Sequence, residues 1–136
     1  MKDILETLSA EDSFRVLLSL LKMTDLLDRL SETEPLTLFA PNDVAFGRVN
    51  LEEISRDKDK LVALLTYHLV PGKLTSTEIA RNEQLLTCNN KSLTVQLEEG
   101  LQEIDNAGYV RADIECSNGI IHVIDNVFLP QFSGWY

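Results

Sequence analysis

The sequence of 136 residues predicts an α+β fold with a helical N-terminal half and a strand-rich C-terminal half. Apolar residues recur at spacings of three and four before Pro71, which is the pattern of a helix with one buried face. From Leu85 onward the apolar period is two, which is the pattern of strands. The length suits one domain with a real core and is short for two ordinary domains. We therefore expect a single domain over residues 1–136.

The first segment, residues 3–31, is expected to form core-facing helices. Ser9 and Asp12 have the spacing of a capping box that would restart the helix, and Thr24 or Asp25 could cap the next turn. The apolar positions on which this expectation rests are Ile4, Leu5, Leu8, Phe14, Leu17, Leu18, Leu21, Leu26, Leu27 and Leu30.

The stretch "TLFAPNDVAF", residues 37–46, predicts a strand followed directly by a helix. Thr37–Phe39 fits a buried strand, and Pro41 ends it because proline cannot donate to a ladder. Asn42 or Asp43 can then accept the free amides of the helix that begins at Val44. The other interpretation, a cation site at Asp43, lacks a second carboxylate nearby in the sequence.

A further helix is expected in "NLEEISRDKDKLVALLTYHLVPG", residues 50–72. Its apolar face contains Leu61, Val62, Leu64 and Leu65, and Pro71-Gly72 forces a turn after it. Thr75 and Glu78 have the spacing of a capping box and predict a short helix through Ile79 and Ala80.

Two hairpins are expected in the second half. The first pairs residues 85–88 with residues 92–97 around Asn89-Asn90, which tolerate positive φ. The second pairs residues 110–116 with residues 120–129 around Asn118-Gly119, a strong signal for a two-residue turn. The returning strand is apolar on both faces and should be covered on both.

Three motifs now stand in order along the chain: "TLFAPNDVAF", "YHLVPG" and "SNGIIHVIDNVFLP". In residues, order and separation they resemble the fasciclin-like domain, and the likeness runs from about Asp3 to Pro130. The resemblance implies a β-wedge of two sheets flanked by helices. It also implies a module without established enzymatic activity that acts in adhesion and matrix association.

Charge and hydropathy exclude several classes of partner. The formal charge is −10 and the twelve Lys and Arg are scattered, so we expect no nucleic-acid partner. No apolar run reaches the length of a membrane span. Met1 is followed at once by charged residues, without the pattern of a secretory leader, so we expect either a protein kept inside the cell or one whose leader has been removed. The resemblance implies an extracellular, periplasmic or cell-surface location, and a cytoplasmic location is the alternative.

The cysteines and histidines are interpreted as structural. Cys88 and Cys116 lie in alternating strand patterns on the expected apolar face, where a thiol acts as a small hydrophobe. A disulfide between them stays open, because sequence cannot place their Cβ atoms at bridging distance. His122 is expected opposite Glu115 with its ring held by hydrogen bonds in the sheet, and Asp125 is expected to anchor backbone groups near the sheet edge.

No metal, cofactor or catalytic motif is identified. Asp57 and Asp59 alternate with lysines and are expected at a solvated helix start, since the glycine and distal glutamate of a calcium loop are absent. Asn90 begins a formal glycosylation sequon at the tip of the first hairpin, and whether it is used stays open.

The pair Tyr67-His68 is the candidate for partner contact. By the resemblance, a Tyr-His pair between aliphatic residues takes part in receptor binding in adhesive relatives. Four aliphatic neighbours before a Pro-Gly turn favour a buried strand end instead, in which His68 orders the core near residues 37–46.

Two functions follow from the sequence. The first is a noncatalytic interaction module in cell adhesion or matrix association, whose partner is an unnamed protein or surface component. The alternative is a small-molecule or lipid-binding protein with an enclosed apolar pocket. The oligomeric state stays open.

Overall fold

Short helices precede and flank a sheet of seven strands, as the change of apolar period predicted. The computed structural model describes residues 2–30, 35–49, 51–88, 91–98, 101–105 and 107–128. The helices and the single 3₁₀ turn of these residues are α1 (Ile4–Ser9), η1 (Asp12–Phe14), α2 (Arg15–Met23), α3 (Leu27–Leu30), α4 (Asp43–Phe46), α5 (Leu51–Ser55), α6 (Lys58–Thr66) and α7 (Ser76–Ile79). The strands are β1 (Leu36–Pro41), β2 (Leu69–Pro71), β3 (Gln84–Leu86), β4 (Ser92–Glu98), β5 (Leu101–Ile104), β6 (Ala107–Cys116) and β7 (Gly119–Ile124).

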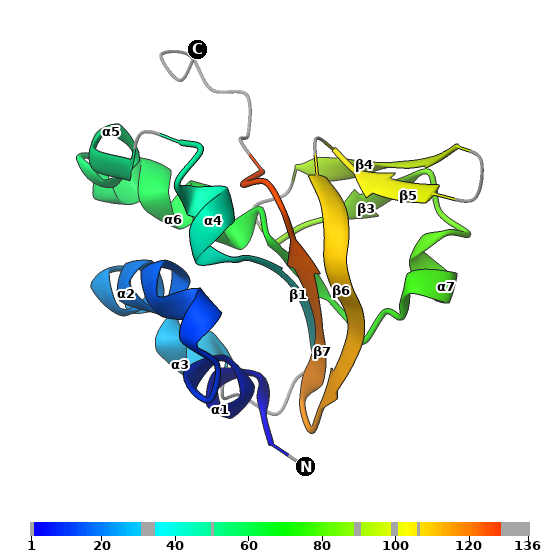
Figure 1. Cartoon of the computed structure of the whole chain (residues 1–136), viewed down its shortest axis with the longest axis horizontal. Coiled ribbons are helices and arrows are strands. Elements are labelled where there is room, and N and C mark those ends of the chain that lie inside the picture. Colours follow the sequence, from blue (N-terminus) through cyan, green and yellow to red (C-terminus); the bar gives the residue numbers. More distant parts are fainter. Residues whose placement is uncertain are drawn as a thin grey trace.

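The strands pair in the order β2-β1-β7-β6-β5-β4-β3. β1 runs parallel to β7 and antiparallel to β2, so the first and last strands of the described residues are neighbours. β3, β4 and β5 diverge from the β2-β1-β7-β6 part and form the second side of a wedge (Figure 1). The amide of Cys88 donates to the carbonyl of Leu69 at 2.8 Å, which joins the two sides where the wedge is closed. The predicted α+β wedge flanked by helices is confirmed.

The central strands β1 and β7 contribute side chains to two hydrophobic cores, because successive side chains of a strand point to opposite faces. On β1, Leu38 packs into a first core with the helices, while Phe39 packs into a second core inside the wedge. On β7, Ile121 belongs to the first core and Ile124 to the second. All six residues of each strand are buried, as expected for strands covered on both faces.

The joint between β1 and α4 has the predicted chemistry. β1 ends at Pro41, and the side chain of Asn42 accepts the amide of Ala45 at 2.8 Å. The carboxylate of Asp43 accepts the amide of Val16 at 2.9 Å, so this turn also attaches α2.

The helix ends near the N-terminus differ from the prediction. Asp3 and Glu6 form the capping box, at the start of α1, whereas Ser9 is the last residue of that helix. Thr24 follows α2, and its hydroxyl donates back to the carbonyl of Leu20 at 2.9 Å. The expected box of Ser9 with Asp12 is wrong because Ser9 ends α1, and Thr24 does not cap the next turn because it lies at the end of α2. Asp25, the other expected cap, has a φ of 60°, whereas an N-cap residue has extended backbone.

The turn between β6 and β7 is also one residue earlier than predicted. Cys116 pairs with Gly119, so Ser117 and Asn118 form the turn, and neither has positive φ. Asn118 is buried, accepts the amide of Ile4 at 2.9 Å and donates to the carbonyl of Leu30 at 2.7 Å. The conformation of this turn is therefore stabilised by the contacts of Asn118 with α1 and α3. It does not depend on residues with left-handed backbone.

Gly119 is required at the start of β7 by close packing. A Cβ at this position would lie 1.9 Å from the carbonyl oxygen of Leu36 in β1. β7 ends at Ile124, before the predicted residue 129, and Leu129 lies outside the described residues. Asp125 then holds β6, because its carboxylate accepts the amide of Gly108 at 2.9 Å.

The first hairpin pairs Leu86 with Ser92, as the sequence predicted in outline. Its first strand ends at Leu86 and not at Cys88, while Asn89 and the sequon residue Asn90 lie outside the described residues. The predicted capping box of Thr75 with Glu78 is present at α7. Among the described residues, no helix has the length and apolar character that crossing a membrane requires.

Candidate functional site

Tyr67 and His68 connect the end of α6 to the start of β2. Tyr67 is 7% exposed and His68 is 1% exposed, so the predicted burial of His68 is confirmed. The aliphatic neighbours Leu64, Leu65 and Leu69 are buried as well. The pair therefore lies beneath the surface of the domain in this structure.

Both ring nitrogens of His68 have backbone partners. Nδ1 lies 2.8 Å from the carbonyl oxygen of Leu64 and must donate to it, while Nε2 accepts the amide of Phe128 at 3.0 Å. The imidazole also stacks on the ring of Phe128, with centroids 4.8 Å apart. This arrangement needs the neutral ring, and burial lowers the pKa of His68 to about 4 although the Leu64 hydrogen bond opposes that change.

Tyr67 connects α6 to the far side of the wedge. Its hydroxyl donates to the carboxylate of Asp105 at 2.7 Å, and the same carboxylate accepts the amide of Thr94 at 2.7 Å. Asp105 has a φ of 52°, in the turn between β5 and β6. Tyr67 and His68 thus each hold a distant segment, which is a structural task for both side chains.

His122 is buried on the wedge side of β7. Its Nδ1 accepts the amide of Asp113 at 3.1 Å, and its Nε2 lies 2.9 Å from the carbonyl of Leu74, to which it donates. Burial lowers the pKa of His122, and the hydrogen bond to Leu74 and the charge of Asp113 oppose that change. The hydrogen-bonded ring was predicted.

The predicted partner of His122 is wrong. Glu115 pairs with Ile120 because the β6-β7 turn is one residue earlier than predicted. Two bulges lie farther along β6, between Tyr109 and Ile114. The bulges bring Asp113, which has a φ of 59°, to the imidazole instead.

The two thiols differ in exposure. Cys116 is buried, as predicted, whereas Cys88 is only half-buried because β3 ends before it. Both are free thiols, and burial raises the pKa of each above its ordinary value. Neither has the lowered pKa of an activated nucleophile.

Asp57 and Asp59 occupy the solvated start of α6. Asp57 is the N-cap residue, and its carboxylate accepts the amide of Asp59 at 3.0 Å. Within the ranges that the structure describes, no three His, Cys, Asp or Glu residues are grouped closely enough to hold a metal ion.

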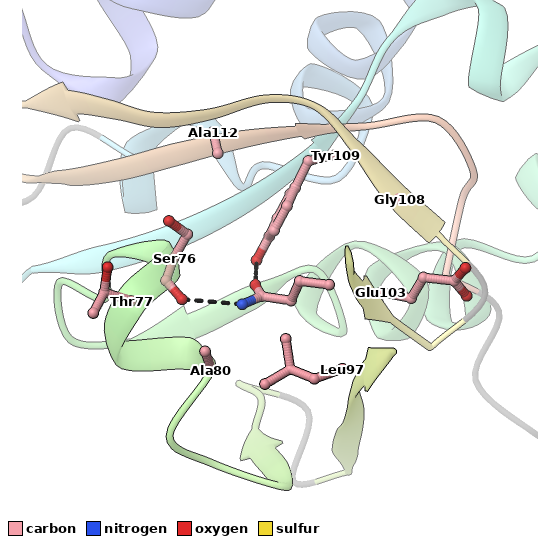
Figure 2. A pocket seen from close by; sticks show the side chains of 9 residues that line it. Ser76, Thr77, Ala80, Leu97, Glu103, Gly108, Tyr109 and Ala112 are labelled. Atoms are coloured by element: carbon pink, nitrogen blue, oxygen red, sulfur yellow. Dashed lines mark hydrogen bonds between the residues drawn. The ribbon is translucent and has the colours of Figure 1, made fainter. Parts of the chain in front are cut away.

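A groove of about 630 Å³ lies at the open end of the wedge, between α7 and strands β4, β5 and β6 (Figure 2). It is open to solvent, and its walls combine small, apolar and polar residues. The lining residues are Ser76, Thr77, Ala80, Leu97, Gln102, Glu103, Gly108, Tyr109 and Ala112.

A chain of hydrogen bonds crosses the groove. The hydroxyl of Tyr109 donates to Gln102 Oε1, and Gln102 Nε2 donates to the carbonyl of Ser76 at 3.1 Å (Figure 2). The amide and hydroxyl of Ser76 both donate to the carboxylate of Asp113, at 2.7 and 2.6 Å. Burial and then the charge of Asp113 raise the pKa of Tyr109, so its hydroxyl stays protonated and donates.

No sequence pattern predicted this groove. A signal existed in the apolar alternation of β4, where Leu93 is buried, Val95 is half-buried and Leu97 is exposed. The alternation shows that these three residues lie on one face of the strand. Only the fold shows at which residue the elements packed on that face end. A second, smaller hollow of about 370 Å³ lies among the N-terminal helices, lined by Leu5, Ser9, Leu18, Ser19, Lys22 and Leu27.

Comparison with known proteins matches residues 12–130 to the model of the fasciclin domain. The chain is 38% identical over 132 residues to Protein sll1483 of a Synechocystis strain, covering 93% of this chain and 73% of that protein. It is 30% identical over 134 residues to human periostin, covering 95% of this chain and 16% of periostin.

The fold matches a solved structure of a FAS1 domain pair from the insect cell adhesion molecule Fasciclin I. The TM-score is 0.79 at 24% sequence identity, covering 95% of this chain and 51% of that chain. The match extends over nearly all of the present chain and about half of the solved pair.

Proposed function

This chain belongs to the fasciclin domain family, and on that premise we propose that it is a noncatalytic module that binds a protein or matrix component at a cell surface. Fasciclin I, whose FAS1 domain pair has this fold, is a cell adhesion molecule, and this supports the adhesive role. The location proposed with it is extracellular, periplasmic or on the cell surface.

One observation carries the noncatalytic part of the proposal. All four ring nitrogens of the two histidines hydrogen-bond to backbone groups inside the domain. A general base needs a nitrogen that can exchange a proton with a substrate, and His68 and His122 have none available in this arrangement. Burial raises the pKa of both cysteines, so neither has the lowered pKa that is typical of a thiolate nucleophile.

The Tyr67-His68 pair supports binding through the fold in this proposal. Both side chains are buried and are hydrogen-bonded to other residues of the domain. A partner could touch them only after the junction of α6 and β2 had opened. Direct contact by the pair stays a prediction of the family resemblance alone.

The small-molecule alternative has weaker support. It requires an enclosed apolar pocket, whereas the larger groove is open and partly polar. A protein partner, which covers a surface without entering a closed cavity, fits this geometry better.

The test is a binding experiment with the folded chain immobilised and a solubilised cell-surface and matrix extract flowed over it. We expect saturable retention of a protein component, competed by free chain and lost when the immobilised chain is thermally unfolded. His68→Ala should reduce binding only in step with its loss of thermal stability. Unchanged retention by the unfolded chain, or absence of saturable retention by the folded one, would contradict the proposal.

A further inference from the structure

We infer that His122 and Asp113 form an acid-operated latch, in which a proton on His122 releases α7 and the residues just before it from the wedge. The strands of the sheet stay paired during this movement. The inference goes beyond the proposed function and does not depend on it.

α7 is attached to the wedge by little apolar contact. It lies apart from the other helices, beside the strands of the wedge (Figure 1). Ile79 is buried in the second core, whereas Thr77 and Glu78 of the same helix are exposed. A helix of about one turn has almost no stability of its own in water. Its position therefore depends on Ile79 and on the hydrogen bonds at its start.

The latch supplies hydrogen bonds to both residues that matter at the start of α7. The carboxylate of Asp113 in β6 accepts the amide and the hydroxyl of Ser76, at 2.7 and 2.6 Å. Nε2 of His122 in β7 donates to the carbonyl of Leu74 at 2.9 Å. Loss of these bonds would leave α7 with its single buried side chain.

Two further contacts hold the same segment without the latch. The hydroxyl of Thr37 accepts the amide of Leu74 at 2.8 Å, and Gln102 Nε2 donates to the carbonyl of Ser76 at 3.1 Å (Figure 2). Neither Thr37 nor Gln102 titrates, so these contacts act equally at neutral and acidic pH.

His122 and Asp113 act as one unit. Nδ1 of His122 accepts the amide of Asp113 at 3.1 Å, so the residue that holds Ser76 is itself held by the imidazole. The imidazole is fully buried and packs against the rings of Phe39 and Tyr109, with centroids 5.5 and 5.3 Å away. The ring therefore cannot turn away from its partners while the wedge is closed.

A proton added to His122 breaks this arrangement. Protonated Nδ1 is a donor, and it would face the amide of Asp113, which is also a donor. The imidazolium then competes with Ser76 for the negatively charged carboxylate of Asp113, whose charge acts on the ring. We expect the carboxylate to turn to the ring, which leaves Ser76 without its acceptor and releases the start of α7.

The direction of the pH dependence follows from burial. Burial lowers the pKa of His122 below its ordinary value of 6.5 in the closed form, whereas release of α7 brings water to the ring. The released form therefore binds the proton more tightly. Its population should rise as the pH falls below about 6.5.

The other groups that face His122 keep their charge over this range. From β6, Asp113 has a pKa below its ordinary value and stays charged, and Tyr109 has a raised pKa and stays neutral. From β1 the ring meets Phe39, and from the segment before α7 it meets the carbonyl of Leu74, neither of which titrates. The pH response of the latch therefore comes from His122.

The experiment is hydrogen exchange of the full chain, followed by NMR from about pH 7.5 to about pH 5, with each rate divided by the intrinsic rate of that amide at the same pH. The amides of Ile79 and Ala80 report on α7, because they donate to the carbonyls of Thr75 and Ser76 at 2.9 and 3.0 Å. We expect their protection to be constant above about pH 6.5 and to fall by about 10-fold at about pH 5. Low urea should leave this exchange unchanged, since the release of one short helix exposes little surface.

A matched pair of histidine variants assigns the effect. His122→Gln keeps an acceptor and a donor at this position but does not titrate, so the protection of α7 should change by less than about 2-fold over the same range. His68→Gln makes the same substitution at the other buried histidine, whose partners are Leu64 and Phe128, and should keep the fall of about 10-fold.

Glu78→Gln tests the carboxylate of α7 itself. It removes a charge from the capping box and retains an oxygen that can accept the amide of Thr75. The fall in protection should persist in this variant. If it disappeared, Glu78 would be the trigger and the role of His122 would be overturned.

Three other results would overturn the latch: constant protection of α7 in wild type down to about pH 5, an equal fall in His122→Gln, or exchange of α7 in acid with the urea dependence of the Ile121 amide in β7. The last result would mean that α7 opens only when the whole domain unfolds. The wild-type profile tests the inference even where His122→Gln fails to fold. Retention of a surface protein at neutral pH does not depend on any of these results, so the proposed function would stand.

Discussion

At the scale of single residues, the two buried histidines hold opposite neutral tautomers. His68 donates from Nδ1 and accepts at Nε2, whereas His122 accepts at Nδ1 and donates from Nε2. A proton added to either ring would convert the accepting nitrogen into a donor. That donor would then face a backbone amide that is itself a donor. The structure therefore excludes the charged form at both positions, and acid should weaken it.

We expect the free energy of unfolding to fall as the pH drops below about 6.5, because the unfolded chain then binds a proton at position 68 and the folded chain does not. The contribution of His68 is fully present above its ordinary pKa of 6.5 and is lost as pH falls toward about 4. That difference in pKa corresponds to about 3 kcal/mol at pH 4. Urea unfolding of wild type and His68→Gln at several pH values measures it.

Carboxylates titrate in the same range, so the informative quantity is the difference between wild type and His68→Gln. We expect the variant to lose less stability than wild type between pH 7 and pH 4.5. NMR of the imidazole should show His68 neutral at pH 5. An identical pH dependence for both proteins would contradict the assigned hydrogen bonds.

Gly119 gives a second prediction at this scale. Gly119→Ala would place a methyl group 1.9 Å from the carbonyl oxygen of Leu36 and 2.8 Å from Ile4 Cδ1, so β1 or β7 must move. We expect it to lower the free energy of unfolding by about 3 kcal/mol or more. Gly72→Ala is the comparison, since Gly72 has a φ of 95° but no atom within 4 Å of the new Cβ, and it should cost about 1 kcal/mol. Equal losses in urea unfolding would show that the close contact relaxes freely.

The structural role of a residue could be predicted from the sequence where its partners are neighbours in the chain. It could not be predicted where the partners are distant in the chain. Asn42 could be assigned from its neighbours because a cap depends on amides within three residues. Asn118 could not, since its partners are Ile4 and Leu30, at the other end of the chain. Asp3 and Glu6 also have the spacing of a capping box in the sequence, and they form it at the start of α1.

At the scale of elements, α7 is held on the wedge by side chains of three strands. Thr37 of β1 accepts the amide of Leu74 at 2.8 Å, and His122 of β7 donates to the carbonyl of the same residue. Asp113 of β6 accepts from both the amide and the hydroxyl of Ser76. Burial raises the pKa of Asp113, but the two hydrogen bonds from Ser76 lower it below its ordinary value, so the carboxylate stays charged.

We expect Asp113→Gly to loosen α7 while leaving the sheet intact. Glycine keeps the φ of 59° accessible and removes the carboxylate that binds Ser76. Hydrogen exchange of the Ile79 and Ala80 amides should accelerate by about 10-fold, because their bonds open locally when the start of the helix is released. Asp25→Gly is a matched control, since Asp25 also has positive φ (60°) but is paired with Lys58. Faster exchange of α7 in both variants would contradict the role of Asp113.

The strand elements were predictable where alternation is regular and unpredictable where it breaks. Val110, Ala112, Ile114 and Cys116 alternate with polar residues in the sequence, a pattern that predicts one shared core-facing side, yet Val110 is 51% exposed and Ala112 is exposed. The bulges reverse the expected faces, and a bulge depends on the partner strand, whose register the sequence cannot supply. The groove borders this irregular part of β6 at Tyr109 and Ala112, so its position also depends on long-range pairing.

At the scale of the whole molecule, β1 and β7 lie between two cores and contribute alternate side chains to each. Leu64 on the helical side and Leu93 on the wedge side are both fully buried. Neither core is complete without these two strands, and Tyr67 adds a hydrogen bond to Asp105 across the wedge. We therefore expect the helical part and the wedge to unfold together.

Leu64→Ala and Leu93→Ala test this expectation, one in each core. Each should lower the free energy of unfolding by about 2–5 kcal/mol, as for other buried leucines. In both variants far-UV circular dichroism, dominated by the helices, and near-UV dichroism, which reports on the packing of tyrosines such as Tyr67, should change at the same urea concentration. If Leu93→Ala moved the near-UV transition to lower urea and left the far-UV transition in place, the wedge would be an independent folding unit. Coincident transitions in both variants are the expected result, because the strands that would have to separate belong to both cores.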